Sequence, residues 1–283
     1  MMTARQLARW RVFIEMTKGK LYLVATPIGN MEDITLRAIR TLKEVDIIAC
    51  EDTRHSLPLL THYEIKKPLV SYYKQKEQEG SEYILSKLEE GQNVALISDA
   101  GMCCISDPGA VLVQKAWENG YEVTVVPGPS AVVSAFALSG ITESTGFCFL
   151  GFLPQQLKAR KTLLAKYKNV DVPLVFYESP HDILKDCEFL LEELGDREIV
   201  IVKEITKIYE KVIKCKLSSV EIENVKGEFV LIVKPREQGY EMSIEEHLMG
   251  YIDAGMDKKS AVKQVAKDRN IPKNEVYQVA LKL

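Results

Sequence analysis

The sequence predicts an α/β protein whose two layered halves face each other across a cleft. Short apolar runs alternate with helix-like stretches along most of the 283 residues. The runs are nearly continuous in β-branched and apolar residues, as parallel strands covered on both faces require. Three of them lead directly into loops rich in glycine and proline. A chain of this length has room for about two ordinary domains and a small appendage.

The first half, expected to form a domain over residues 20–139, carries five strand signals and four helix signals. Gly91 and Gly120 follow two of the helix signals, as glycines often do where a helix ends. The expected strands span residues 21–25, 46–50, 69–72, 94–97 and 123–126, and the expected helices span residues 34–42, 81–90, 109–118 and 130–138. This order predicts a layered domain of βαβ units.

The second half, expected over residues 140–235, begins with a small polar linker. Its expected strands are residues 147–152, 174–177 and 199–203, and its expected helices are residues 157–167 and 181–194. The last two apolar runs, residues 210–216 and 228–233, lie close together across a loop and are expected to be antiparallel strands.

The last 48 residues, 236–283, are predicted to form a small helical module. Helix signals cover residues 243–254, 260–268 and 273–281, and so few residues are not expected to be robust alone. Three short helices with a basic middle one are similar to a helix-turn-helix module that contacts nucleic acid. At the other end, residues 1–19 are basic and lack the apolar segment of a secretory signal. We expect a disordered extension or a misassigned start there, with Met16 as the alternative initiator.

Charge is distributed unevenly along this slightly acidic chain. The net charge of −3 and the isoelectric point near 5.9 argue against a protein that coats nucleic acid. Two segments, residues 158–168 and 258–273, nevertheless carry a net charge of +5 each. They suit a polyanion held at chosen places, and the alternative is two solvated helix faces.

The six cysteines show neither a C-x-x-C pair nor a cluster with zinc spacing. This pattern favours a reducing cytoplasm with the thiols used as small hydrophobic groups, and it predicts no metal. No apolar run approaches the ~18 residues that span a bilayer, so we expect no membrane partner.

Three loops follow expected strands and precede expected helices. They are Thr26-Pro27-Ile28-Gly29-Asn30, Ser98-Asp99-Ala100-Gly101 and Pro127-Gly128-Pro129-Ser130. In an open α/β sheet such loops gather at the carboxyl ends of the strands, where small ligands bind. The alternative is that each is an ordinary strand-to-helix turn.

Taken in order, six motifs give the chain a family resemblance. They are Leu21-Tyr22-Leu23-Val24-Ala25 with the first loop, Glu51-Asp52-Thr53-Arg54, the second loop with Ile105-Ser106-Asp107-Pro108-Gly109, Val126 with the third loop and Ala131, Gly151-Phe152-Leu153-Pro154, and Phe176-Tyr177-Glu178-Ser179-Pro180-His181. From Lys20 to the C-terminus the chain resembles ribosomal RNA small subunit methyltransferase I, a family with the tetrapyrrole methylase fold.

The resemblance implies a two-domain tetrapyrrole-methylase-like fold with a small C-terminal helical module. It implies S-adenosylmethionine in the cleft between the domains and methylation of the 2′-hydroxyl of a cytidine ribose in 16S rRNA of the small (30S) subunit. Members of this fold are commonly homodimers. Two alternatives stay open: a methyltransferase for a small tetrapyrrole-like molecule, and a non-catalytic protein that binds RNA or assists ribosome assembly.

The same resemblance implies the site. The expected cofactor-binding residues lie mostly on the loops, whose backbone can approach a ligand closely: they are Pro27, Gly29, Ser98, Asp99, Ala100, Gly101, Ile105, Ser106, Pro127, Gly128, Ser130, Ala131, Tyr177, Gly227 and Glu228. The expected RNA-binding residues are Lys158, Arg160, Lys161, Lys258, Lys259 and Lys263.

The chemistry adds catalytic candidates. A methyl group on a sulfonium is already activated, so the protein must chiefly align donor and acceptor. A ribose hydroxyl is a weak nucleophile unless a base takes its proton. The candidates on the motif loops are Asp52, Arg54, Asp99 and Glu178. Arg54 can pair with Asp52 or with an RNA phosphate, and the alternative for these two is a local pair that stabilises a turn.

Two positions depart from the family pattern. Met102, Cys103 and Cys104 stand where the family usually has Thr-Pro, so the loop loses the rigidity of proline. Asp182 follows His181 where the family often has arginine, which weakens the case for an RNA contact there.

Overall fold

The computed structural model describes residues 18–142, 144, 146–235, 242–269 and 271–283. The chain divides into two compact units with the boundary between Lys234 and Pro235. The predictions for residues 1–17, including the alternative start at Met16, lie outside the described residues.

The first unit contains two five-stranded sheets, and the first of these is parallel throughout. Its strands are β1 (Lys20–Val24), β2 (Ile47–Cys50), β3 (Leu69–Ser71), β4 (Val94–Ile97) and β5 (Glu122–Val126). They pair in the order β3-β2-β4-β1-β5. The α/β class predicted from the runs of apolar residues is confirmed.

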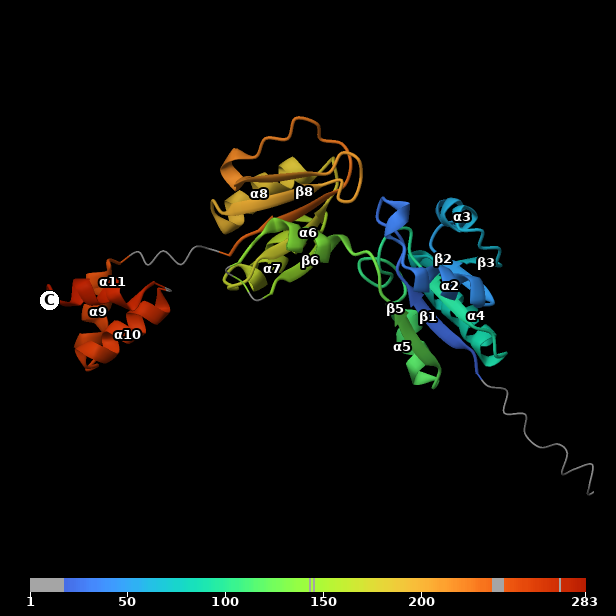
Figure 1. The fold of residues 1–283 in the computed structure, drawn as a ribbon, viewed down its shortest axis with the longest axis horizontal. Helices are drawn as coiled ribbons and strands as arrows, with labels where there is room; N and C mark the ends of the chain where they lie inside the picture. The colour runs from blue at the N-terminus through green and yellow to red at the C-terminus, as the bar shows by residue number, and fades with distance from the viewer. Residues whose placement is uncertain (1–17, 143, 145, 236–241, 270) are drawn as a thin grey trace, which may run out of the picture. The chain divides into compact units, whose positions relative to one another are not determined.

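Helices cover both faces of this parallel sheet (Figure 1). They are α2 (Leu36–Glu44), α3 (Thr53–His62), α4 (Glu77–Glu89) and α5 (Ala110–Glu118), with short 3-10 turns at Met31–Asp33 and Lys74–Lys76. Side chains of α2 and α3 pack with Val24, Ile48 and Ile97, and side chains of α4 and α5 pack with Leu21 and Leu96. The strands are therefore apolar on both sides, as their sequences indicate.

The helix α3 was not predicted from the sequence. Pro58 lies inside it, and a proline reads as a helix breaker because it lacks the N–H that bonds one turn back. The Asp52 side chain caps the helix, and Leu59 and Leu60 are buried against the sheet. Capping and burial therefore outweigh the missing hydrogen bond.

The second sheet is mixed. Its strands are β6 (Cys148–Phe152), β7 (Leu174–Glu178), β8 (Glu198–Lys203), β9 (Lys211–Lys216) and β10 (Phe229–Val233), in the order β6-β7-β10-β8-β9. The expectation that the last two runs lie together as antiparallel strands needs correction. Both β9 and β10 are antiparallel to β8, which lies between them, so they do not pair with each other.

Three helices cover the second sheet. They are α6 (Ala131–Ser139), α7 (Leu157–Tyr167) and α8 (Ile183–Leu194). Leu164 of α7 and Leu190 of α8 share one core with Phe176, whereas Val132 of α6 shares another with Val175 and Val230. Alternate residues of β7 therefore face α7 and α8 on one side of the sheet and α6 on the other.

The second unit holds the three helices expected near the C-terminus, α9 (Ile244–Asp253), α10 (Lys258–Asp268) and α11 (Lys273–Ala280). A capping box between Ser243 and Glu246 starts α9, and Asp257 caps α10. A small core around Leu248, Val265 and Val276 joins them. Among the described residues of both units, every helix is too short or too polar to cross a bilayer.

Candidate functional site

The loops after β1, β4 and β5 contact one another in the structure. Thr26 and Gly101 exchange two backbone hydrogen bonds, with N···O distances of 2.9 and 3.1 Å. Gly101 has a φ of +79°, and a Cβ there would lie 3.2 Å from Cγ2 of Ile28 and 3.6 Å from the Pro129 carbonyl oxygen. Gly101 thus joins all three loops, in a conformation that glycine adopts readily.

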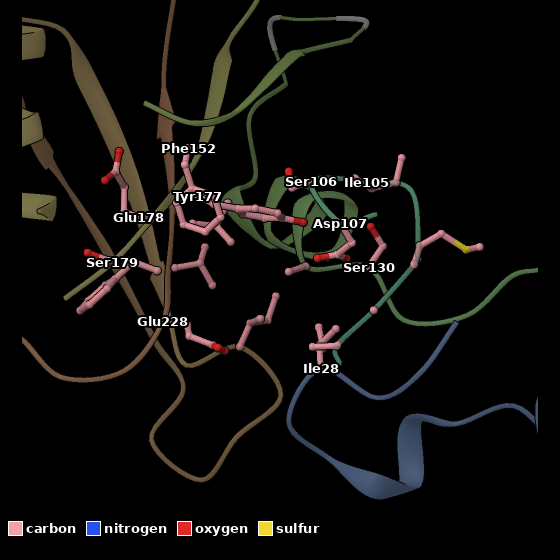
Figure 2. A pocket seen from close by; sticks show the side chains of 18 of the residues that line it. Ile28, Ile105, Ser106, Asp107, Ser130, Phe152, Tyr177, Glu178, Ser179 and Glu228 are labelled. Carbon is pink, nitrogen blue, oxygen red and sulfur yellow. The ribbon is translucent and has the colours of Figure 1, made fainter. Parts of the chain in front are cut away.

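A cavity of about 380 Å³ opens beside these loops, and we call it the larger cavity. The first half of the unit contributes Ile28, Ala100, Gly101, Met102 and the segment Ile105, Ser106 and Asp107. The second half contributes Phe152, Tyr177, Ile205, Glu228 and their neighbours (Figure 2). The size lies within the range of about 300–1,000 Å³ that is usual for small-ligand sites.

Aromatic rings form one wall of the larger cavity. The rings of Phe152 and Tyr177 lie 5.6 Å apart between centroids, and Phe149 packs against Tyr177 at 4.8 Å. The hydroxyl of Tyr177 bonds to the backbone of Val132 at the start of α6. The planes of the Phe152 and Tyr177 rings are tilted by 58°, so the wall offers apolar ring faces, held in place from behind, against which a planar ligand group can pack.

Several carboxylates lie near Asp107, which lines the larger cavity. Burial, together with the nearby Glu51 and Asp99 carboxylates, raises the pKa of Asp107 to about 6. Burial and the same kind of repulsion from Asp99 and Asp52 raise the pKa of Glu51 above its usual range. Like charges crowded at a partly buried place raise each other's pKa, and a cationic ligand would relieve the repulsion. Asp107 was not among the predicted site residues.

Met102, Cys103 and Cys104, which stand where the family usually has Thr-Pro, do not block the larger cavity. Met102 lines the cavity, Cys103 is buried with its thiol 3.6 Å from the Leu96 carbonyl oxygen, and Cys104 takes a φ of +68°. Ser106 has a φ of +66° as well. Two residues other than glycine in the left-handed region mark a strained loop, which is common at ligand sites.

A second cavity of about 270 Å³ adjoins the first, and we call it the smaller cavity. It shares Ile28, Ala100 and Glu228 with the larger one. Of the predicted cofactor residues, Gly101, Ile105, Ser106, Ser130, Ala131 and Tyr177 line only the larger cavity, and Pro27, Gly29, Ser98 and Asp99 line only the smaller one. Pro127, Gly128 and Gly227 line neither.

The catalytic candidates Asp52 and Arg54 form a local pair. The carboxylate of Asp52 accepts hydrogen bonds from the Arg54 backbone N–H at 2.8 Å and from its Nη2 at 2.7 Å. These bonds lower the pKa of Asp52 to about 2. The pair starts α3 and lines neither cavity, although the side chain of Arg54 is 88% exposed and accessible to a phosphate.

Of the other two catalytic candidates, Asp99 lines the smaller cavity, whereas Glu178 borders the larger cavity but turns its carboxylate away from it (Figure 2). The side chain lies on the face of β7 that meets α8, beside Asp186. Burial and the Asp186 carboxylate raise the pKa of Glu178 to about 9. Glu178 is therefore protonated at neutral pH and can donate a hydrogen bond to Asp186, which suits a structural role.

The predicted RNA-binding residues divide by exposure. Lys158, Lys161, Lys258, Lys259 and Lys263 are exposed, the first two on α7 and the others on α10. Arg160 is different, because its guanidinium is 14% exposed and pairs with Asp186. Its Nε also donates to the Pro154 carbonyl at 2.6 Å. Arg160 thus links α7 to α8 inside the domain and presents little charge to a partner.

Sequence reasoning missed His55, Lys207 and Ile205. His55 directly follows Arg54, the last residue of the Glu51–Arg54 motif, and this adjacency was the available signal. Lys207 and Ile205 lie between β8 and β9, and both enter cavities formed with the first half. Only the three-dimensional pairing of the two halves brings them there.

A comparison with family models identifies the class of this protein. Residues 20–221 match the tetrapyrrole (corrin/porphyrin) methylases. Among solved structures, the uroporphyrin-III C-methyltransferase of Thermus thermophilus, complexed with S-adenyl homocysteine, aligns with a TM-score of 0.54. The alignment covers 76% of this chain and 97% of that one at 22% identity. The two-sheet architecture is thus the methylase fold.

Comparison with curated proteins narrows the class. The chain is 45% identical to the ribosomal RNA small subunit methyltransferase I of Halalkalibacterium halodurans, over 93% of this chain and 94% of that one. It is 43% identical to the protein of the same name from Bacillus subtilis, over 92% and 93%. The chain belongs to the ribosomal RNA small subunit methyltransferase I family, and the resemblance predicted from the six motifs is confirmed.

Proposed function

We propose that this protein transfers a methyl group from S-adenosylmethionine to the 2′-hydroxyl of a cytidine ribose in 16S rRNA. The observation that carries the proposal is the identity of 45% and 43% to relatives named for this kind of substrate, across more than nine tenths of the chain. Identity at this level extends through both halves that line the larger cavity.

The larger cavity suits S-adenosylmethionine in size and in charge. The donor carries a positive sulfonium and an ammonium group, and the raised pKa of Asp107, which lines the cavity, marks a carboxylate that a cationic ligand would stabilise. The wall of Phe152 and Tyr177 suits the adenine ring. The loop backbone at Ala100 lies at the cavity and can place polar groups close to a ligand.

The donor supplies a methyl group that the positive sulfur has already activated. The chain's own residues have to fix its direction and keep water away. Ile28, Met102 and Ile105 are apolar and surround the larger cavity, which supports the exclusion of water. Glu178 is withdrawn from this chemistry because its carboxylate faces Asp186.

The proposal also covers the substrate particle, the oligomeric state and the location of the protein. We take the 30S subunit as the substrate and a homodimer as the active state, because the family resemblance implies both, and the cytoplasm as the location, because the cysteine pattern favours it. Light scattering of the purified protein tests the dimer. A monomer at working concentration would remove that part of the proposal without affecting the reaction.

The experiment for the reaction uses 30S subunits from cells that lack this methylation. The subunits are incubated with the protein and S-adenosylmethionine labelled in the methyl group, and the rRNA is digested and separated. We expect the label in 2′-O-methylcytidine from 16S rRNA. Label taken up by a tetrapyrrole precursor in a parallel incubation, with none in the rRNA, would support a small-molecule methyltransferase. Failure to bind the donor in calorimetry would support a non-catalytic RNA-binding protein.

A further inference from the structure

The smaller cavity contains polar groups that the proposed donor site does not use. It lies beside the larger cavity, and Ile28, Ala100 and Glu228 border both. A group bound in one cavity would therefore lie next to a group in the other, at the edge that these three residues share. Methyl transfer requires this arrangement, because donor and acceptor must meet in line.

The imidazole of His55 is oriented at the smaller cavity. Its Nδ1 lies 3.1 Å from Oδ2 of Asp99, at the end of β4. A carboxylate that accepts from Nδ1–H leaves the lone pair of Nε2 able to take a proton. The backbone of His55 is held as well, because Asp52 caps α3 and pairs with Arg54 immediately before His55.

The opposite wall is built by the loop between β8 and β9. The aliphatic chain of Lys207 crosses Gly29 so closely that a Cβ on Gly29 would lie 2.5 Å from its Cγ. Its Nζ lies 2.8 Å from Glu204 and 2.9 Å from Glu228. Glu204 and Thr206 have φ values of +50° and +66°, so the loop is strained where it meets the first half.

Among the groups that line the smaller cavity, the carboxylate of Asp99 faces Nδ1 of His55 and that of Glu228 faces Nζ of Lys207, which leaves His55 as the base. The Asp52 carboxylate is held by Arg54, which makes it a weak base. Asp107 lines the larger cavity and not the smaller one. Lys207 holds its ammonium between two carboxylates. His55 lies at the smaller cavity with a side chain 71% exposed, so a polymer can reach it.

We propose that the smaller cavity receives the ribose of the target nucleotide and that His55 accepts the proton of its 2′-hydroxyl. The hydroxyl oxygen forms a bond to the methyl carbon as the bond from that carbon to sulfur breaks. Sulfur keeps the electron pair and becomes a neutral thioether, and the proton passes to Nε2 of His55 and later to water. The inference rests on the proposed function.

The test compares wild type, His55→Ala and His55→Gln on undermethylated 30S subunits. A general base contributes about 10²–10⁴-fold, so we expect kcat to fall by at least about 100-fold in both variants. KM for the subunit and the Kd of S-adenosylmethionine should stay within about twofold, because His55 does not line the larger cavity. Added imidazole should restore part of the rate of His55→Ala, since the site is open to solvent.

His62→Ala is the matched control, because His62 is an exposed histidine at the other end of α3. It should keep the wild-type rate. A kcat of His55→Ala within about threefold of wild type, or a slow variant that imidazole does not rescue, would overturn the role of His55. A wild type that places no methyl group on cytidine would instead overturn the proposed function and this inference with it.

Discussion

At the residue scale, three carboxyl groups near the site have pKa values set by different surroundings. Hydrogen bonds from Arg54 lower the pKa of Asp52 to about 2. Burial, with help from other carboxylates, raises the pKa of Asp107 to about 6. Deeper burial beside Asp186 raises the pKa of Glu178 to about 9. At neutral pH they are a helix cap, a charge facing the larger cavity and a neutral hydrogen-bond donor.

Asp107 predicts a pH dependence for the methyl donor. As pH falls through about 6, Asp107 takes up a proton and loses the charge that faces the cavity, so the affinity for S-adenosylmethionine should fall. Asp107→Asn should bind about tenfold more weakly at pH 7.5, with a flatter profile between pH 5 and 7.5, measured by calorimetry. Asp253→Asn, an exposed change on α9, is the control. Wild-type affinity in Asp107→Asn would contradict the prediction.

Glu178 predicts a pH dependence for stability. Its pKa is raised from 4.5 to about 9 in the folded protein, so folding retains a proton that the unfolded chain releases. This contribution is full below about pH 4.5 and is lost as pH rises toward 9. Glu178→Gln should have a Tm at least equal to wild type at pH 9 and a flatter profile from pH 5 to 9. A Tm several degrees below wild type at every pH would mean that the amide does not replace the acid.

At the element scale, strands and helices could be predicted well because each has a local signal. Strand β4 and helix α7 occupy the predicted residues, and most other elements shift by one to three residues at their ends. The misses have physical causes. Helix α3 was missed because Pro58 lies inside it and reads as a helix breaker. The pairing of β9 and β10 with β8 was missed because it depends on contacts between distant residues, which no local pattern contains.

The candidate site could be predicted only in part for the same reason. Gly101, Ser106 and Tyr177 stand in recognisable motifs and line the larger cavity. Lys207 and Gly29 both line the smaller cavity, although they are far apart in the sequence. Only the folded chain brings the two together. Gly227 was expected to bind the cofactor, whereas the structure places it against Glu204, where a Cβ would lie 2.5 Å from Cδ.

The contact between Gly29 and the loop that joins β8 to β9 predicts how a larger residue at position 29 affects activity. Gly29→Ala places a Cβ 2.5 Å from Cγ of Lys207 at a φ of +151°, so Lys207 must move from the smaller cavity. We expect kcat to fall at least tenfold while the donor Kd stays within about twofold. Gly120→Ala is the control, because Gly120 also has a positive φ but has open space around it. It should cost only about 1 kcal/mol of stability. Full activity of Gly29→Ala would show that Lys207 is dispensable there.

At the scale of the whole molecule, charge is arranged for one kind of partner. The chain is acidic overall, with a net charge of −3, yet exposed lysines follow one another on α7 and α10. Arg160 does not add to this surface because Asp186 pairs with it. Local positive charge on an acidic protein favours selected phosphates over general adhesion to nucleic acid.

Charge reversal on α10 tests that arrangement. Lys258, Lys259 and Lys263 are exposed, so changing all three to Glu should leave the small core of the second unit intact. Each lost phosphate contact should reduce the slope of log K against log salt by about 0.7–0.9, so we expect weaker binding to 30S subunits and a flatter salt dependence. The donor Kd should not change, since these residues line neither cavity. The control reverses Lys43, Lys66 and Lys226, which are exposed on the first unit and give the same net charge. If both triple variants lose affinity equally, overall charge and not α10 attracts the RNA.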